Sequence, residues 1–388
     1  MVPGYLYEKN NKYYMVLDLR DEHGKRKMKW ISTGLPVKGN KRRAENMLQE
    51  TRRNYENPEQ VPDDDMLFSE LLLKWLAIMK PKLAVTTYAS YENSVHKIIV
   101  PYFKKARIKL SKLTSMQLDE FYTEQSQRVT QSTVLHYHAI IHKALKYACK
   151  NKLIISNPAD DAERPHPQKF EANFYNSEEI TELFQIVKGT KLEIPVLLAA
   201  FYGLRRSEVV GLKWSAIDFS QNTISIKHTV TTCYIGGKRV TTAIDRTKNL
   251  SSNRTLPLVP EVKERLLALK EEQKEMHRVC KRSYCKDYLD YICVDQLGNL
   301  INPDYITEAF PKLLEKNGLR RIRFHDLRHS CASLLLDNNV PMKEIQEWLG
   351  HSDFSTTANI YSHLEYKAKI SSANAMAEGL SSALNNLK

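Results

Sequence analysis

Long hydrophobic runs are missing from this sequence. The longest apolar stretch, residues 194–203, covers about half of the ~20 residues that a transmembrane helix needs, so we expect no membrane span. The first residues carry no apolar core of a signal peptide, and we therefore expect a cytoplasmic protein. Glycine (13 residues) and proline (15 residues) are too scarce for a collagen-like or low-complexity chain.

Cysteine is also scarce, and none of the six cysteines forms a Cys-x-x-Cys pair. Cys280 and Cys285 could ligate zinc together with His277, but their spacing is irregular and there is no second cluster. Reduced thiols are the better interpretation. A carboxylate cluster of the kind that holds Mg²⁺ is not evident either, which disfavours a two-metal nuclease. We therefore expect no metal site.

Positive charge is what the sequence has in excess. Lys and Arg number 58 against 45 Asp and Glu, which gives a net charge of +13. A basic surface attracts polyanions, so nucleic acid is the first candidate partner, with simple solubility as the alternative. The 388 residues are 42% hydrophobic and 27% charged, which suits two or three soluble globular domains.

Residues 1–57 concentrate much of this charge, with thirteen basic and seven acidic residues and a net charge of +6. Period-two alternation predicts short strands at 5–9, 13–20 and 27–32, with turns at Asn10-Asn11 and 22–24, before a helix from about residue 41. Lys25, Lys27 and Lys29 alternate and should share one sheet face, and a basic sheet face can enter a DNA major groove. The alternative is an ordinary solvated face.

Two linkers, at 58–65 and 159–172, divide the rest of the chain. Between them, an apolar stripe over 68–76 and further periodic segments predict helices over about 84–99, 115–126 and 132–151. After them, Ser177 begins a helix, and 223–230, 238–244 and 254–258 have the pattern of short strands. The predicted fold is mainly α with small β elements, in domains at 1–57, 66–160 and 173–388.

The third segment holds the polar motifs. An apolar helix ends at Gly203 and is followed by Arg205, whose guanidinium can bind a phosphate, and by Glu208 one helical turn on. His325 and Arg328 are three residues apart, on one face of a helical turn, and can contact one anion. The remaining candidates are Lys248 in a turn between two predicted strands, His351 after a helix end, and Tyr361. Each alone has an ordinary structural explanation.

Together these residues are the parts for a displacement at a phosphodiester. Two arginine forks bind the non-bridging oxygens and stabilise the charge of the transition state. A tyrosine hydroxyl is a covalent nucleophile, and a lysine can protonate the leaving oxygen.

In this combination and order the sequence resembles the tyrosine recombinase (phage integrase) family. Its two arginine boxes are matched by Gly203-Leu204-Arg205-x-x-Glu208 and His325-x-Leu327-Arg328-His329. Its lysine hairpin is matched by Thr247-Lys248 and Arg254-Thr255-Leu256-Pro257-Leu258, and its third histidine and nucleophile by Leu349-Gly350-His351 and Ile360-Tyr361. Arg206 follows Arg205, but the position after Gly-Leu favours Arg205. The helical segment resembles the family's core-binding domain, and residues 1–57 resemble the arm-binding domain of conjugative-transposon integrases.

This resemblance implies a site-specific DNA recombinase. Tyr361 would attack a scissile phosphate to form a 3′-phosphotyrosine, and two rounds of exchange would pass through a Holliday junction without ATP or metal, so no cofactor is expected. Arg205 and Arg328 would hold the phosphate, with Glu208 in support. Lys248 would act as general acid, and His325 and His351 would hydrogen-bond the phosphate or move its protons.

Two alternatives stay open: a DNA-relaxing enzyme with the same chemistry, like a type IB topoisomerase, and a catalytically silent DNA-binding regulator. The partners expected of a recombinase are double-stranded DNA at core and arm sites, a homotetramer on paired sites, and accessory DNA-bending or excision proteins. An apolar stripe over 370–387 predicts a tail helix, which docks either on its own domain or on a neighbouring protomer.

Overall fold

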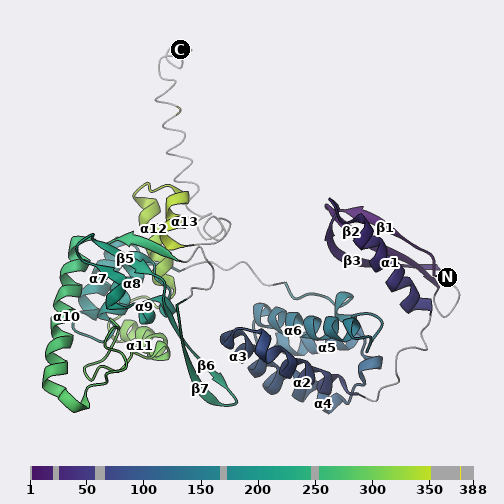
Figure 1. The fold of residues 1–388 in the computed structure, drawn as a ribbon, viewed down its shortest axis with the longest axis horizontal. Helices are drawn as coiled ribbons and strands as arrows, with labels where there is room; N and C mark the ends of the chain where they lie inside the picture. The colour runs from purple at the N-terminus through teal and green to yellow at the C-terminus, as the bar shows by residue number, and fades with distance from the viewer. Residues whose placement is uncertain are drawn as a thin grey trace, which may run out of the picture. The chain divides into compact units, whose positions relative to one another are not determined.

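The computed structural model describes residues 2–20, 26–56, 66–166, 173–245 and 253–350, together with Met376. The chain divides into two compact units, Met1–Gln168 and Lys169–Lys388 (Figure 1). The fold is mainly α with small β elements, as predicted. Among the described helices, none is both long and apolar enough to cross a membrane.

An antiparallel sheet begins the first unit, with strands β1 (Gly4–Lys9), β2 (Lys12–Arg20) and β3 (Arg26–Pro36) in the order β1-β2-β3. Asn10 and Asn11 take positive φ angles of 51° and 57°, the geometry of a two-residue hairpin turn, which confirms the predicted turn. Helix α1 (Lys41–Glu56) packs on one face of the sheet, where Met15 and Leu17 are buried against Leu48 (Figure 1).

The rest of the first unit is helical. Its helices are α2 (Phe68–Met79), α3 (Val85–Ser94), α4 (Val100–Ala106), α5 (Ser115–Ser126) and α6 (Gln131–Lys150), with 3₁₀ turns at Lys80–Lys82, Leu110–Lys112 and Pro158–Asp160. The apolar stripe predicted over 68–76 is buried at Phe68, Leu71, Leu72, Trp75 and Leu76. The rings of Phe68 and Phe103 pack edge to face with centroids 4.8 Å apart, which joins α2 to α4.

The helix predicted over 84–99 is longer than expected. After α3 the chain passes through a π-helical turn (Val95–Ile99) and continues as α4 to Ala106. Pro101 lies in the first turn of α4, where its missing N–H costs little, and the N–H of Val100 bonds the carbonyl of Val95, five residues back. The wider turn therefore carries the helix past a proline at which the pattern predicts an end.

Helices make up most of the second unit: α7 (Ser177–Val187), α8 (Glu193–Tyr202), α9 (Arg206–Gly211), α10 (Pro260–Cys280), α11 (Pro303–Lys316), α12 (Asp326–Asp337) and α13 (Met342–Leu349). Short 3₁₀ turns cover Trp214–Ala216 and Lys281–Ser283. Helix α7 begins at Ser177 as predicted. Asn176 Oδ1 accepts the backbone N–H of Glu179 at 2.9 Å, and the Glu179 carboxylate accepts the backbone N–H of Asn176 at 2.9 Å.

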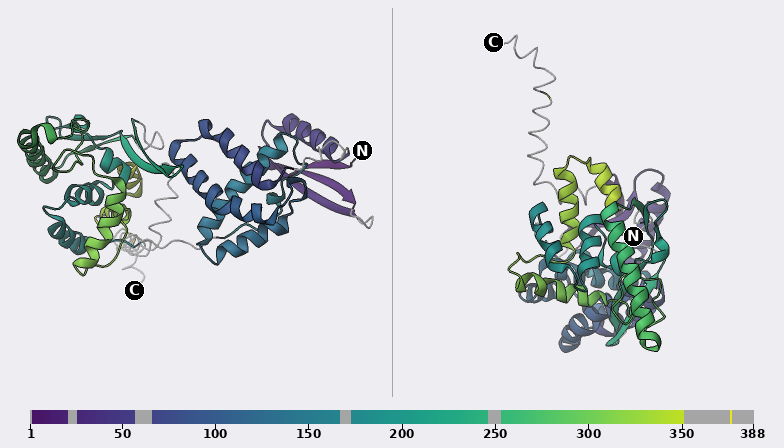
Figure 2. Two further views of the ribbon diagram at one scale, coloured as in Figure 1. Left: turned by 90° about the horizontal axis from the view of Figure 1, so that it is seen from below. Right: turned by 90° about the vertical axis from the view of Figure 1, so that its left-hand side faces the viewer.

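Two small sheets complete this unit. Strands β4 (Ile217–Asp218), β5 (Thr223–Ile226) and β8 (Arg254–Pro257) form one in the order β4-β5-β8, while β6 (Thr229–Ile235) and β7 (Lys238–Ile244) form a hairpin that projects from the body of the unit (Figure 1). Helix α8 lies in the core beside α12, and α12 lies beside α13 (Figure 2). This packing brings the end of α8, the start of α12 and the end of α13 together.

Residues 223–230, predicted as one strand, belong to two strands in different sheets. The chain turns at His228, whose ring nitrogens lie 2.5 Å from Asp245 Oδ1 and 2.9 Å from Tyr291 Oη. The backbone there also packs on α9: a Cβ on Gly211 would lie 2.7 Å from the carbonyl oxygen of His228. These contacts with distant residues break the strand, and the alternation of the sequence does not reveal them.

Candidate active site

Arg205 and Glu208 are held together at the start of α9. Arg205 caps the helix, and the Glu208 carboxylate accepts its backbone N–H at 3.0 Å and its Nη1 at 2.7 Å. Glu208 is only 1% exposed, so its charge is stabilised by these partners rather than by water. The Arg205 side chain is 31% exposed and can therefore meet a ligand.

Gly203 links α8 to this turn. Its φ of 62° is left-handed, and a Cβ there would lie 2.3 Å from Leu349 Cδ2 and 3.6 Å from Arg328 Cγ. Glycine is thus needed both for the backbone conformation and for the close approach of α12 and α13.

Arg328 enters the same place from α12 and is 2% exposed. Its guanidinium donates to the carbonyl oxygens of Gly203 and Leu349, each at 2.6 Å. Burial, followed by the charge of Arg205, lowers the pKa of Arg328 to about 9, and the group stays charged at neutral pH. The two predicted arginines, distant in sequence, therefore converge on one site.

Arg206, the neighbour of Arg205, points elsewhere. Its Nη1 donates to the carbonyl of Pro303 at 3.2 Å and to the Thr307 hydroxyl, and it lies 3.8 Å from Asp304 Oδ1. These partners belong to α11. Of the two adjacent arginines, Arg205 is the one at the site.

His325 immediately precedes α12. Burial lowers its pKa to about 4, with further contributions from His329 and Arg328, so the imidazole is neutral at physiological pH. A neutral imidazole has one N–H donor and one acceptor, and it can hydrogen-bond an anion without competing with the arginines for charge. His329 lies beside it, with ring centroids 5.5 Å apart.

Arg254 is a member of the site that the sequence reasoning did not single out. It begins β8, its side chain is 6% exposed, and its Nη2 lies 3.1 Å from Glu208 Oε2. The signal was present: Arg254, Leu256 and Leu258 are all buried at alternating positions, and an arginine on the inward side of a strand needs a buried acid.

Four predicted site residues lie outside the described residues: Lys25, Lys248, His351 and Tyr361. The described chain reaches Gly350, whose carbonyl accepts Arg205 Nη2 at 3.3 Å. Both arginines therefore contact the backbone immediately before His351.

Lys27 and Lys29 lie on β3 opposite Leu19 and Leu17, on the face of the sheet that carries α1. Lys27 is exposed, while Lys29 is half-buried with its Nζ 3.5 Å from Asp161 Oδ2. The opposite face exposes Tyr5, Tyr7, Met28 and Trp30, and the rings of Tyr7 and Trp30 pack edge to face at 5.0 Å.

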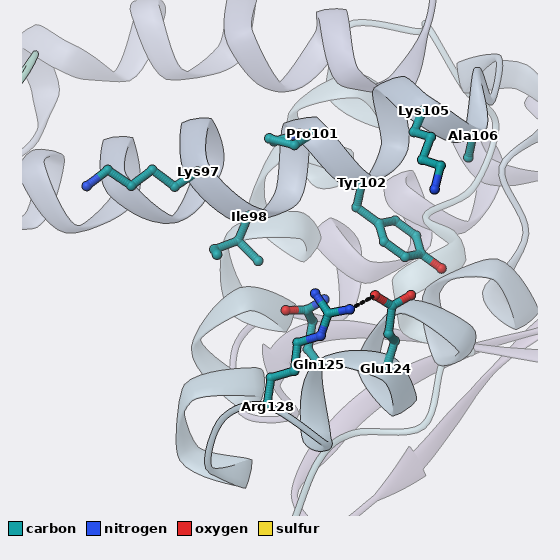
Figure 3. Close-up of a pocket in the computed structure, with 9 residues that line it drawn as sticks. All are labelled: Lys97, Ile98, Pro101, Tyr102, Lys105, Ala106, Glu124, Gln125 and Arg128. Atoms are coloured by element: carbon teal, nitrogen blue, oxygen red, sulfur yellow. Dashed lines mark ion pairs between the residues drawn. The ribbon is translucent and has the colours of Figure 1, made fainter.

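Within the described ranges, no three His, Cys, Asp or Glu residues gather in a way that could hold a metal ion. A groove of about 510 Å³ lies between α4 and the end of α5, lined by Lys97, Lys105, Glu124 and Arg128 among others (Figure 3). Arg128 pairs with Glu124 at 3.0 Å across its floor. Its lining belongs to the first unit, and no predicted catalytic residue among the described ones takes part in it.

The fold and the converging arginines define a protein with a cationic site suited to an anion, and the comparisons identify its family. Residues 173–368 match the model of the phage integrase family, and residues 67–126 match a phage integrase N-terminal SAM-like domain. The chain belongs to the phage integrase family. It is a tyrosine recombinase, an enzyme that cleaves and rejoins DNA in site-specific recombination, and it resembles conjugative-transposon integrases in layout.

One relative is a "Tyrosine recombinase XerC-like" protein of Caldanaerobacter subterraneus, 28% identical over 94% of this chain and 95% of its own. The Tn1549 transposon integrase in complex with a circular intermediate DNA has a similar fold, with a TM-score of 0.65 and 16% identity over 79% of this chain and 99% of that one. A lambda integrase tetramer bound to a Holliday junction matches with a TM-score of 0.55 and 14% identity over 91% and 96%. These likenesses give no support to the DNA-relaxing enzyme or the silent regulator.

Proposed function

We propose that this recombinase integrates and excises a mobile element through a 3′-phosphotyrosine intermediate and a Holliday junction. Three domains divide the work in this proposal: 1–57 binds arm-type DNA, 66–160 binds the core site, and 173–388 carries the chemistry. The observation that carries the proposal is the convergence of Arg205 and Arg328 on one site. Glu208, on α9, holds Arg205 there.

The net charge of this cluster suits the transition state of a phosphodiester displacement. Arg205, Arg254 and Arg328 bring three positive charges and Glu208 one negative charge, so the cluster has an excess of two. A phosphodiester carries one negative charge, and a second develops as the nucleophile adds. Fixed guanidinium groups stabilise that added charge without reorganising at the moment of reaction.

In the proposed cleavage step, the Tyr361 hydroxyl attacks the phosphorus. A bond from the tyrosine oxygen to phosphorus forms and the bond to the 5′ oxygen breaks. Lys248 gives a proton to the leaving oxygen. The tyrosine proton passes to the imidazole of His325 or of His351, and the other histidine hydrogen-bonds a non-bridging oxygen. The phosphotyrosine keeps the bond energy, and the 5′ hydroxyl of a partner duplex attacks it to complete the exchange without a cofactor.

Arm binding is assigned to the N-terminal sheet. Lys25, Lys27 and Lys29 supply the proposed phosphate contacts, and the exposed face with Tyr7 and Trp30 is the second candidate surface of the same sheet. Exchange between two sites needs two pairs of protomers, so we propose a homotetramer on paired core sites, with accessory DNA-bending or excision proteins setting the direction.

A trapping assay tests the proposed chemistry. The full chain is incubated with a nicked element-end duplex, from which the short 5′-hydroxyl fragment diffuses away and leaves the covalent adduct. The wild type should form an adduct that maps to Tyr361, and Tyr361→Phe should bind the duplex with the same affinity and form none. An adduct of Tyr361→Phe at the wild-type yield would refute the assignment.

A further inference from the structure

Glu208 is shared between two arginines. Its Oε1 accepts Nη1 of Arg205 at 2.7 Å, while its Oε2 accepts the backbone N–H of Arg205 at 3.0 Å and Nη2 of Arg254 at 3.1 Å. Burial raises the pKa of Glu208, but the guanidinium groups of Arg254, Arg205 and Arg328 outweigh burial and hold that pKa below its ordinary value. The carboxylate is charged, and its two oxygens face different arginines.

Of the three arginines, Arg205 is the one whose side chain is substantially exposed to solvent. The Arg205 side chain is 31% exposed, whereas that of Arg254 is 6% exposed and Arg328 is 2% exposed. Arg254 is also bound into β8, which pairs with β5 through Ile226. The guanidinium of Arg254 lies against Glu208, so Arg254 can act on Arg205 through that carboxylate. Burial alone does not decide this, since Arg328, a proposed phosphate ligand, is more buried still.

Removing Arg254 changes what Glu208 can do to Arg205. A carboxylate binds a guanidinium most strongly with both oxygens, in the bidentate fork. In the described contacts, Oε2 accepts Nη2 of Arg254 and the backbone N–H of Arg205, while Oε1 accepts Nη1 of Arg205. The Arg254 guanidinium thus competes for the oxygen that a bidentate fork with Arg205 would use. Without Arg254, Oε2 keeps only the backbone N–H of Arg205 and can draw a second side-chain N–H of Arg205 toward the carboxylate and away from a phosphate.

We propose that Arg254 is a positioning residue for DNA cleavage: by occupying one oxygen of Glu208, it keeps the guanidinium of Arg205 turned toward the scissile phosphate. This inference rests on the proposed function, since it takes Arg205 as a phosphate ligand. A competing explanation is that Arg254 fixes the general acid, because Lys248 lies six residues earlier in the chain.

The two explanations separate on a substrate whose 5′ bridging oxygen is replaced by sulfur. A thiol is a far stronger acid than an alcohol, so a sulfur leaving group departs without a proton and the general acid is no longer needed. The experiment measures the single-turnover rate of adduct formation and the DNA affinity of the full chain, on matched oxygen and sulfur duplexes.

Arg254→Met should slow adduct formation about 10–100-fold on both duplexes with DNA affinity unchanged, as expected for a misplaced phosphate ligand. Arg254→Lys, which keeps the charge, should restore part of the rate. Lys248→Ala should be slow on oxygen and recover on sulfur. The matched control is Arg265→Met, which breaks an arginine–glutamate pair of 2.6 Å with Glu193 outside the site and should react at the wild-type rate.

The double variant Glu208→Gln with Arg254→Met removes both charges of the buried pair, so neither is left unpaired in the folded chain. It should be no slower than Glu208→Gln alone, because Arg254 acts through Glu208. The inference is overturned if Arg254→Met reacts at the wild-type rate, if sulfur restores it, if the two losses add, or if Arg265→Met is equally slow. Any of these, with Tyr361→Phe still inactive, leaves the proposed function intact, whereas an active Tyr361→Phe overturns that function itself.

Discussion

Arg328 and Leu349 are joined by a hydrogen bond of 2.6 Å, from a guanidinium nitrogen to the backbone carbonyl at the end of α13. A second bond of the same length runs from Arg328 to Gly203 at the end of α8. One buried side chain of α12 thus binds the ends of α8 and α13. Leu349, at the end of α13, lies two residues before His351 in the chain. The arginine that we propose to bind phosphate is also a structural tie.

Arg328→Lys tests both roles, because an ammonium keeps the charge but cannot reach two carbonyls as a planar fork does. We expect adduct formation to fall about a hundredfold or more, as for a lost transition-state donor. The free energy of unfolding should fall by about 1–3 kcal/mol, because a buried carbonyl loses its donor. Urea unfolding and the trapping assay measure the two effects. Arg278→Lys, on the exposed surface of α10, is the control and should change neither.

Gly203→Ala should be more damaging than alanine at another left-handed glycine. At Gly203 the φ is 62° and the new Cβ would lie 2.3 Å from Leu349 Cδ2, whereas Gly236, at the tip of the β6–β7 hairpin, has φ 57° and nothing within 4 Å. Backbone strain alone costs about 1–2 kcal/mol, and overpacking adds about 1–3 kcal/mol. Equal losses at the two positions in urea unfolding would show that the contact with Leu349 is relieved without cost.

Stability should fall as the pH drops from about 6.5 to about 4. Burial, with Arg164 and His142, lowers the pKa of His138 from 6.5 to about 4, so in this window the unfolded chain takes up a proton that the folded chain refuses. The unfolded state is then favoured, by about 2–3 kcal/mol over this window for one such histidine. His138→Gln should reduce the difference in unfolding free energy between about pH 7.5 and about pH 5. His166→Gln, an exposed position, should not.

Changing Lys25, Lys27 and Lys29 to Ala should weaken arm-site binding and lower its salt dependence, by about one unit of slope for each lysine that contacts a phosphate. Cleavage of a short core site should survive, because the core-binding and catalytic residues are unchanged. The comparison variant is Tyr7→Ala with Trp30→Ala, on the opposite face. Loss of arm binding in this pair alone would assign the DNA contact to the aromatic face.

Deleting residues 370–388 tests whether the tail helix predicted from the sequence docks on a neighbouring protomer. Single-site binding should stay intact, because the DNA-binding domains are untouched, while assembly on paired core sites should be lost. Native gel shifts on one and on two core sites separate these states. A truncated chain that assembles on two sites as well as the full chain would assign the apolar stripe to packing within one protomer.

Local signals predicted the elements whose causes are local. Asn10-Asn11 forms its hairpin turn because asparagine tolerates positive φ, and Asn176 begins α7 through a capping box with Glu179. The same reasoning failed where a distant residue decides. The strand predicted over 223–230 breaks at His228 because Gly211, Asp245 and Tyr291 hold it.

The arginine site shows the same division. Motif spacing picked out Arg205 and Arg328, but which of the adjacent Arg205 and Arg206 faces the site depends on α11, whose Pro303 carbonyl binds Arg206. Arg254 was noted only as part of the lysine-hairpin match, and its pairing with Glu208 was missed because Glu208 lies on another element.

The two hydrogen bonds of Arg328 also depend on the order in which the chain is synthesised. Its two carbonyl partners lie 125 and 21 residues away along the chain, one on each side of it. A nascent polypeptide that has left the ribosome only as far as α12 has Gly203 but no Leu349, so the guanidinium cannot yet be seated. The order of synthesis therefore leaves Arg328 with only one of these two carbonyl partners until α13 has been made.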